Sequence, residues 1–120
     1  MLFRSGRIID AEGLFVVPGA IDTHSHIEEE FKGVKPLETW TQATRNAAVG
    51  GVTMVLNFVN QAKGKTMVET VEDEIERING LTCIDYNVHP VFIYYDDNDA
   101  VVAQLPVLKD MGIPDRKSVV

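Results

Sequence analysis

The chain has 120 residues, of which 45% are hydrophobic and 24% are charged, a balance typical of a folded globular domain rather than a disordered segment. Its formal charge of −7 argues against nucleic acid as a partner, because such binders place Lys and Arg against phosphates. No apolar run approaches the roughly 20 residues that span a bilayer, and Arg4 and Arg7 stand where a signal peptide would be apolar. We therefore expect a cytoplasmic protein with no membrane or nucleic-acid partner.

The first half of the chain reads as two strands separated by a helix. Continuous apolar runs alternate with amphipathic stretches, which is typical of a parallel sheet covered by helices, so the predicted class is α/β. The first strand is expected at 15–21, where Pro18 should interrupt the hydrogen-bond ladder. A helix is expected from about Pro36 to the glycines at 50–51, and a second strand at 53–59.

The second half repeats this alternation. Residues 66–80 begin with the Thr-x-x-Glu spacing of a capping box and predict a helix. A third strand region follows at 82–94, and residues 96–112 predict a further helix, which Pro106 could divide into two short ones. Residues 113–120 begin a weak fourth strand. The lone cysteine, Cys83, falls in an apolar run and is expected to be a buried thiol.

Repetition of strand and helix limits the architecture to two choices. Three to four such units form part of a (β/α)8 TIM barrel, which typically needs about 250 residues, or else a small open sheet of the doubly wound kind.

A histidine pair is the main candidate for chemistry. His24 and His26 are two residues apart, so on an extended segment both imidazoles point to the same side and can converge on one cation. Imidazole suits zinc and other first-row divalent metals. The pair is placed just past the first strand, and Asp22 on the same face could orient a ligand. Taken alone, the pair also fits an ordinary sheet surface.

The context of the pair resembles a known family. Residues 17–26, VPGAIDTHSH, closely resemble the Pro-Gly-x-Ile-Asp-x-His-x-His signature of the amidohydrolase superfamily. The resemblance extends over about residues 9–117 and is closest to the dihydropyrimidinases and hydantoinases. It is carried by three further stretches, at 9–13, 47–53 and 84–89.

This resemblance implies a barrel with a binuclear metal centre, usually zinc, joined by a carboxylated lysine, in which a hydroxide attacks a ring amide. His24 and His26 match the first two metal ligands. Lys117 matches the bridging lysine, because residues 112–117 follow the family's Gly-Ile-x-x-x-Lys spacing. A solvated lysine remains the alternative for Lys117. His89 matches a position that is not a ligand, and we expect it to be a packed strand residue.

The resemblance also implies domains and partners. Residues 1–14 are expected to be a remnant of the segment that links the family's β-sandwich domain to the barrel, and 15–120 the N-terminal part of that barrel. The substrate is expected to be a small cyclic ureide or imide, and the assembly a homo-oligomer, a tetramer in the family. The family's other ligands and catalytic aspartate follow its lysine, so this chain is expected to be an inactive fragment on its own.

Two alternatives stay open at this stage. An allantoinase or another cyclic amidohydrolase would use the same histidines, although Asn57-Phe58 resembles the hydantoinase pattern better. A catalytically silent scaffold, as in the dihydropyrimidinase-related proteins, is the non-enzyme alternative. Those members lost their metal histidines, so His24 and His26 argue against it.

Overall fold

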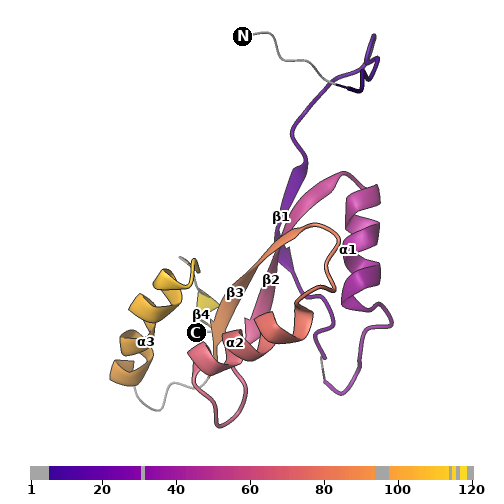
Figure 1. The fold of residues 1–120 in the computed structure, drawn as a ribbon. Helices are drawn as coiled ribbons and strands as arrows, with labels where there is room; N and C mark the ends of the chain where they lie inside the picture. The colour runs from indigo at the N-terminus through magenta and orange to yellow at the C-terminus, as the bar shows by residue number, and fades with distance from the viewer. Residues whose placement is uncertain (1–5, 31, 94–97, 114, 116, 119–120) are drawn as a thin grey trace.

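The structure is a computed structural model that describes residues 6–30, 32–93, 98–113, 115 and 117–118. Strands and helices alternate along the chain (Figure 1). In chain order the elements are β1 (Ala20–Ser25), α1 (Trp40–Val49), β2 (Val52–Asn60), α2 (Met67–Ile78), β3 (Asp85–Phe92), α3 (Asn98–Asp110) and β4 (Lys117–Ser118). The strands form one parallel sheet in the order β1-β2-β3-β4. The α/β class predicted from the alternation is confirmed.

The hydrophobic core lies between one face of this sheet and helices α2 and α3. Its buried members come from the strands, the two helices and the segment after α3: Val59, Met67, Val71, Val88, Phe92, Leu108 and Ile113. Burial of each large apolar side chain contributes about 1.5–3 kcal/mol. Because side chains alternate along a strand, the residues between these core positions point to the opposite face, which carries the candidate site.

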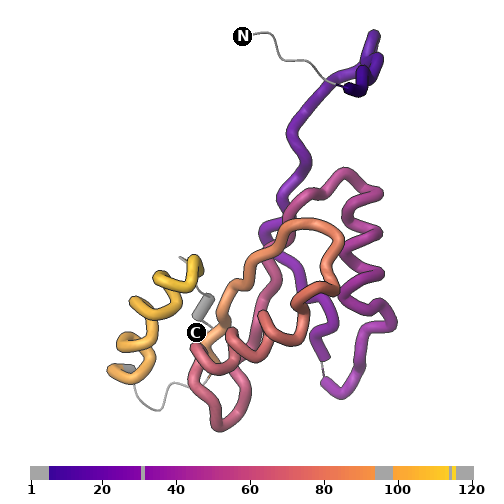
Figure 2. The backbone as a smooth tube through the Cα atoms, in the orientation of Figure 1, coloured from indigo at the N-terminus to yellow at the C-terminus, as the bar shows by residue number. Residues whose placement is uncertain are grey.

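The first strand begins later than the apolar run predicts. Residues 15–19 precede β1, and Phe15 is 99% exposed. The ladder with β2 starts only where Ala20 pairs with Val52, the first residue of β2, and Pro18 has no N–H to extend it. Residues 6–19 extend away from the sheet (Figure 2). The predicted strand at 15–21 is therefore wrong for residues 15–19, and β1 continues to Ser25.

Helix α1 also begins later than predicted, at Trp40 instead of near Pro36. Thr39 is its N-cap: its hydroxyl accepts a hydrogen bond from the Gln42 N–H, and the Gln42 side chain accepts from the Thr39 N–H in return. This capping box satisfies two donors that the helix cannot satisfy itself. Leu37, which the apolar pattern placed in the helix, lies outside it and is 99% exposed.

The elements from β2 to α2 agree with the sequence. Strand β2 is one residue longer at each end than predicted. Helix α2 has the predicted capping box between Thr66 and Glu69, and its apolar stripe packs into the core.

The elements after α2 differ more from expectation. Strand β3 is shorter than the predicted 82–94, and Cys83, expected to be buried, is exposed in the turn before it. Helix α3 continues through Pro106 as one helix, and Leu108, two residues further on, is buried in the core. The fourth strand is present as β4, whereas Asp96 and Asp97 of the predicted helix start lie outside the described residues. Among the helices described, none is long and apolar enough to cross a membrane.

Candidate metal site

The two histidines of the motif meet at the carboxyl end of β1. His24 lies within the strand, which corrects its predicted position past the strand end, whereas His26 directly follows the strand as predicted. Their Nε2 atoms are 3.1 Å apart, and their ring centroids are separated by 5.1 Å. Two nitrogens that each lie about 2.0–2.1 Å from one zinc ion at a tetrahedral angle are roughly 3.3 Å apart. The pair thus fits two ligands of a single small divalent cation.

Phe58 of β2 forms an aromatic platform beside both histidines. Its ring centroid lies 4.2 Å from that of His24 and 5.1 Å from that of His26. On its other flank it stacks on His89 of β3 at 4.6 Å, with an angle of 20° between the rings. Phe58 is only 6% exposed, and its ring gives the imidazoles an apolar surface to pack on.

A cavity of about 460 Å³ opens beside His24 on this face of the sheet. Its wall combines Phe58 and Leu56 with polar groups from β1, β3 and the residue Asp115. His89 lies on this wall and is 3.7 Å from the Asp115 carboxylate, so it is packed between an aromatic ring and an acid. An apolar wall with a few polar groups is typical of a small-molecule site.

A carboxylate lies behind His26. The Nδ1 atom of His26 is hydrogen-bonded to Glu29, whose second oxygen accepts a hydrogen bond from the Asn60 amide. Asn60 is the last residue of β2, so this chain of contacts joins the segment after β1 to the end of the neighbouring strand. Metal-binding histidines commonly donate their other ring N–H to such an acceptor.

Asn57 fixes the backbone immediately after His26. It is 2% exposed, and its Oδ1 accepts a 2.7 Å hydrogen bond from the Ile27 N–H. The Ser25 hydroxyl lies 3.4 Å from the same oxygen and 3.1 Å from the Leu56 carbonyl oxygen. Because Ser25 and Ile27 flank His26, these bonds define where the second histidine leaves the strand.

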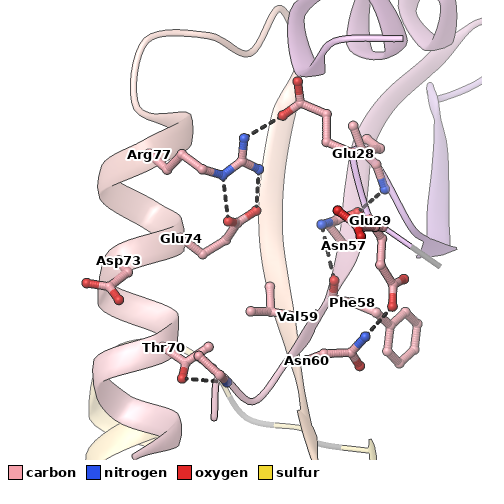
Figure 3. A pocket seen from close by; sticks show the side chains of 13 residues that line it. Glu28, Glu29, Asn57, Phe58, Val59, Asn60, Thr70, Asp73, Glu74 and Arg77 are labelled. Atoms are coloured by element: carbon pink, nitrogen blue, oxygen red, sulfur yellow. Dashed lines mark hydrogen bonds and ion pairs between the residues drawn. The ribbon is translucent and has the colours of Figure 1, made fainter. Parts of the chain in front are cut away.

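The segment after the histidines is also tied to α2 (Figure 3). Arg77 donates two 2.8 Å hydrogen bonds to Glu74 on its own helix and a further one to Glu28. These contacts, those with Glu74 first, hold the pKa of Arg77 above its ordinary value. Glu28 and Arg77 line a cavity of about 420 Å³ between this segment, β2 and α2. Glu28 is thus directed toward Arg77 of α2 and contacts neither histidine in the described part of the chain.

The remaining predicted residues are placed as follows. Asp22 accepts a 3.0 Å hydrogen bond from the His24 backbone N–H, so its carboxylate shapes the strand instead of orienting an imidazole. Lys117 begins β4, where its backbone pairs with Val91; its side chain is outside the described part of the chain. Within the described residues no group of three or more His, Cys, Asp or Glu side chains is arranged to hold a metal ion. The site as described therefore has two imidazoles.

Sequence reasoning missed Glu29, Asn57 and Asn60 as supports of the histidines. Asn60 is 31 positions from its partner Glu29, and Asn57 is 30 positions from Ile27. The one available signal was positional, since polar residues at the carboxyl ends of adjacent parallel strands meet at the same sheet edge.

Comparison with known proteins places this geometry in context. No protein-family model matches the chain. A D-hydantoinase of Rhizobium radiobacter is 38% identical over 109 residues, which cover 91% of this chain and 23% of the relative. A dihydropyrimidinase of Rattus norvegicus is 35% identical over 94 residues, or 78% of this chain and 18% of the relative. A crystal structure of a D-hydantoinase superposes with a TM-score of 0.83 at 31% identity, covering 96% of this chain and 25% of that one. The chain thus spans about a fifth to a quarter of the length of these relatives.

Proposed function

Over the part of those proteins that it spans, the chain belongs to the D-hydantoinase and dihydropyrimidinase family, and from this we propose that it is part of a metal-dependent hydrolase that opens cyclic amides. The substrates we propose are rings of the hydantoin or dihydropyrimidine class. The observation that carries the proposal is the meeting of the His24 and His26 Nε2 atoms, 3.1 Å apart, at the carboxyl end of β1. Barrel enzymes place their catalytic groups at this end of the strands.

We infer that residues 15–120, with their four parallel strands, are the N-terminal part of a (β/α)8 barrel. Residues 1–14 are the segment that links the barrel to a preceding domain. In a barrel, the sheet face opposite the helices becomes the interior, and this is the face that carries His24, Phe58 and His89. Zinc is the metal we propose, with His24 and His26 as ligands and a carboxylated Lys117 as the bridging group. The start of β4 puts Lys117 on the strand next to β3.

The histidines and Phe58 of the site have separate roles in this proposal. When bound, the metal polarises an amide carbonyl and lowers the pKa of a water molecule, which allows hydrolysis near neutral pH. His24 and His26 hold the metal, and Phe58 fixes both rings and gives the cavity an apolar wall. The cavity of about 460 Å³ falls within the roughly 300–1,000 Å³ of small-molecule pockets, so a small ring can enter beside His24.

The described residues supply only part of a catalytic site. Two imidazoles without a third side chain bind a divalent cation weakly, because structural and catalytic zinc sites use three or four protein ligands. We therefore propose that the 120-residue chain alone turns over little substrate, and that activity requires further ligands, in a homo-oligomeric assembly like that of the family.

The activity is tested by transplanting the chain into a relative. In a chimaera, this chain replaces the matching 109-residue segment of the Rhizobium radiobacter D-hydantoinase. Hydrolysis of hydantoin, dihydrouracil and allantoin is measured together with metal content. We expect ring opening of hydantoin or dihydrouracil, lost with either His24→Ala or His26→Ala. Lys117→Ala should also reduce metal content, whereas Lys109→Ala, in the last turn of α3, should not.

Two results would contradict the proposal. A folded chimaera that retains activity and metal after loss of either histidine would remove both residues from the metal site. A folded, metal-loaded chimaera that opens none of these rings would remove the proposed activity.

A further inference from the structure

We propose that Glu29 is a positioning residue for His26: its carboxylate accepts the Nδ1–H of the imidazole, so that Nε2 presents its lone pair to the metal. The inference deepens the proposed function and rests on it, since it assigns a supporting residue to the same metal site. It concerns a side chain that has no part in the histidine motif. Its basis is the pattern of contacts around the three consecutive glutamates at 28–30.

Only Glu29 among these three glutamates contacts a histidine of the site. One Glu29 carboxylate oxygen is hydrogen-bonded to His26 Nδ1, and the other accepts a hydrogen bond from the Asn60 amide. Its side chain is 22% exposed, against 43% for that of His26, so the acid lies deeper than the ring it contacts. Asn60 is the exposed last residue of β2, and its backbone pairs with Val91 of β3, so the carboxylate is tied to the end of the sheet.

The two neighbouring glutamates are committed elsewhere. Glu28 is bonded to Arg77 of α2, on the side of the second cavity. Glu30 faces Lys35 at 3.6 Å and is 50% exposed. Three adjacent carboxylates thus have three different partners, and Glu30 offers a control of the same charge and size one residue away.

The chemistry of a neutral imidazole explains what the contact achieves. One ring nitrogen carries the proton and the other has the lone pair, and a metal takes the lone pair. A carboxylate can only accept, so Glu29 selects the tautomer with the proton on Nδ1 and leaves Nε2 as the donor atom. That Nε2 is the atom facing His24 Nε2 at 3.1 Å, where a shared cation fits. Glu29 therefore sets both the tautomer and the direction of the ring.

Glu29→Gln tests this without changing side-chain size. An amide cannot accept from His26 and from Asn60 as the carboxylate does, because one of its two ends becomes a donor. Loss of an outer acceptor typically weakens metal binding by about 10–100-fold. Titration of the 120-residue chain with Co²⁺, followed by its visible absorption, should therefore show a dissociation constant at least about tenfold higher for Glu29→Gln. Glu30→Gln should bind Co²⁺ like the unmodified chain.

Asn60→Ala provides a second, independent perturbation. It leaves Glu29 in place but removes its anchor, so a smaller loss of Co²⁺ affinity is expected. If Glu29→Gln binds as tightly as the unmodified chain, or if Glu30→Gln weakens binding equally, the positioning role is wrong. If the unmodified chain binds no better than His26→Ala, the proposed metal site itself fails.

A metal-free measurement separates those two failures. Long-range ¹H–¹⁵N correlation spectra of the chain without metal, recorded where His26 is neutral, report which ring nitrogen carries the proton. We expect the Nδ1–H tautomer for His26 in the unmodified chain and in Glu30→Gln, and a mixture in Glu29→Gln. An Nε2–H tautomer in the unmodified chain would overturn the role of Glu29 whatever the metal data show.

Discussion

Replacing Asn57 with Ala tests whether the buried amide holds the second histidine in place. The substitution removes the acceptor of the 2.7 Å hydrogen bond from the Ile27 N–H and of the contact from Ser25. Leaving a buried donor without a partner costs about 1–3 kcal/mol. Ile27 is only part-buried, so water will satisfy some of this loss, while the truncated side chain adds a small cavity. We therefore expect a loss of about 2 kcal/mol in the free energy of unfolding.

Urea unfolding followed by circular dichroism measures this loss directly. A change of this size should lower the melting temperature by roughly 10 °C. Asn46→Ala is the matched control, because the Asn46 side chain is exposed on α1 and donates a 2.9 Å hydrogen bond to the Glu38 side chain. Its effect should stay within about 0.5 kcal/mol. An Asn57→Ala chain as stable as the Asn46→Ala chain would refute the reasoning.

Three further predictions concern stability. A Cβ at Gly19 would overlap the Thr53 side chain, so Gly19→Ala should lower the free energy of unfolding in urea by about 1–3 kcal/mol. The double variant that also carries Thr53→Ala should recover part of this loss. Equal stability of the unmodified chain and both variants would contradict this. Thr39→Ala and Thr66→Ala each remove a helix cap and should each cost about 1 kcal/mol, and no loss in either would argue against that capping box. Hydrogen bonds from the Thr66 backbone N–H and then its hydroxyl lower the pKa of Glu69 below its ordinary value of 4.5. The contribution of the Glu69 carboxylate to the free energy of unfolding should be complete above pH 4.5 and be lost as pH falls through the lowered pKa. The difference in the free energy of unfolding between the unmodified chain and Glu69→Gln should therefore disappear in acid. A difference that does not change with pH would contradict this.

The elements that sequence predicted well are those decided locally. The Thr66 and Glu69 pair satisfies its own helix terminus within four residues, so the start of α2 could be read directly. The same signal exists at Thr39 and Gln42, but Pro36 and the apolar Leu37 favoured an earlier start, and the real helix leaves Leu37 exposed. Local preference for a helix start was outweighed by the bonds that the cap provides.

The elements that sequence predicted poorly depend on distant partners. Apolar residues at 15–17 have the composition of a strand, yet no residue in the described chain pairs with them. Hydrogen-bonded pairing with β2 begins only at Ala20 and Val52. The histidine pair could be located because its spacing is two residues. Its supports could not be, since Glu29 meets Asn60 only after two strands lie side by side.

Binding of one divalent cation by His24 and His26 is the central claim, and isothermal titration of the 120-residue chain with Zn²⁺ tests it most directly. The claim predicts one weak site that is lost in His24→Ala and in His26→Ala. His89→Ala should retain that site, because His89 packs on Phe58 and Asp115 instead of joining the pair. Unchanged Zn²⁺ binding after removal of either His24 or His26 would contradict the account.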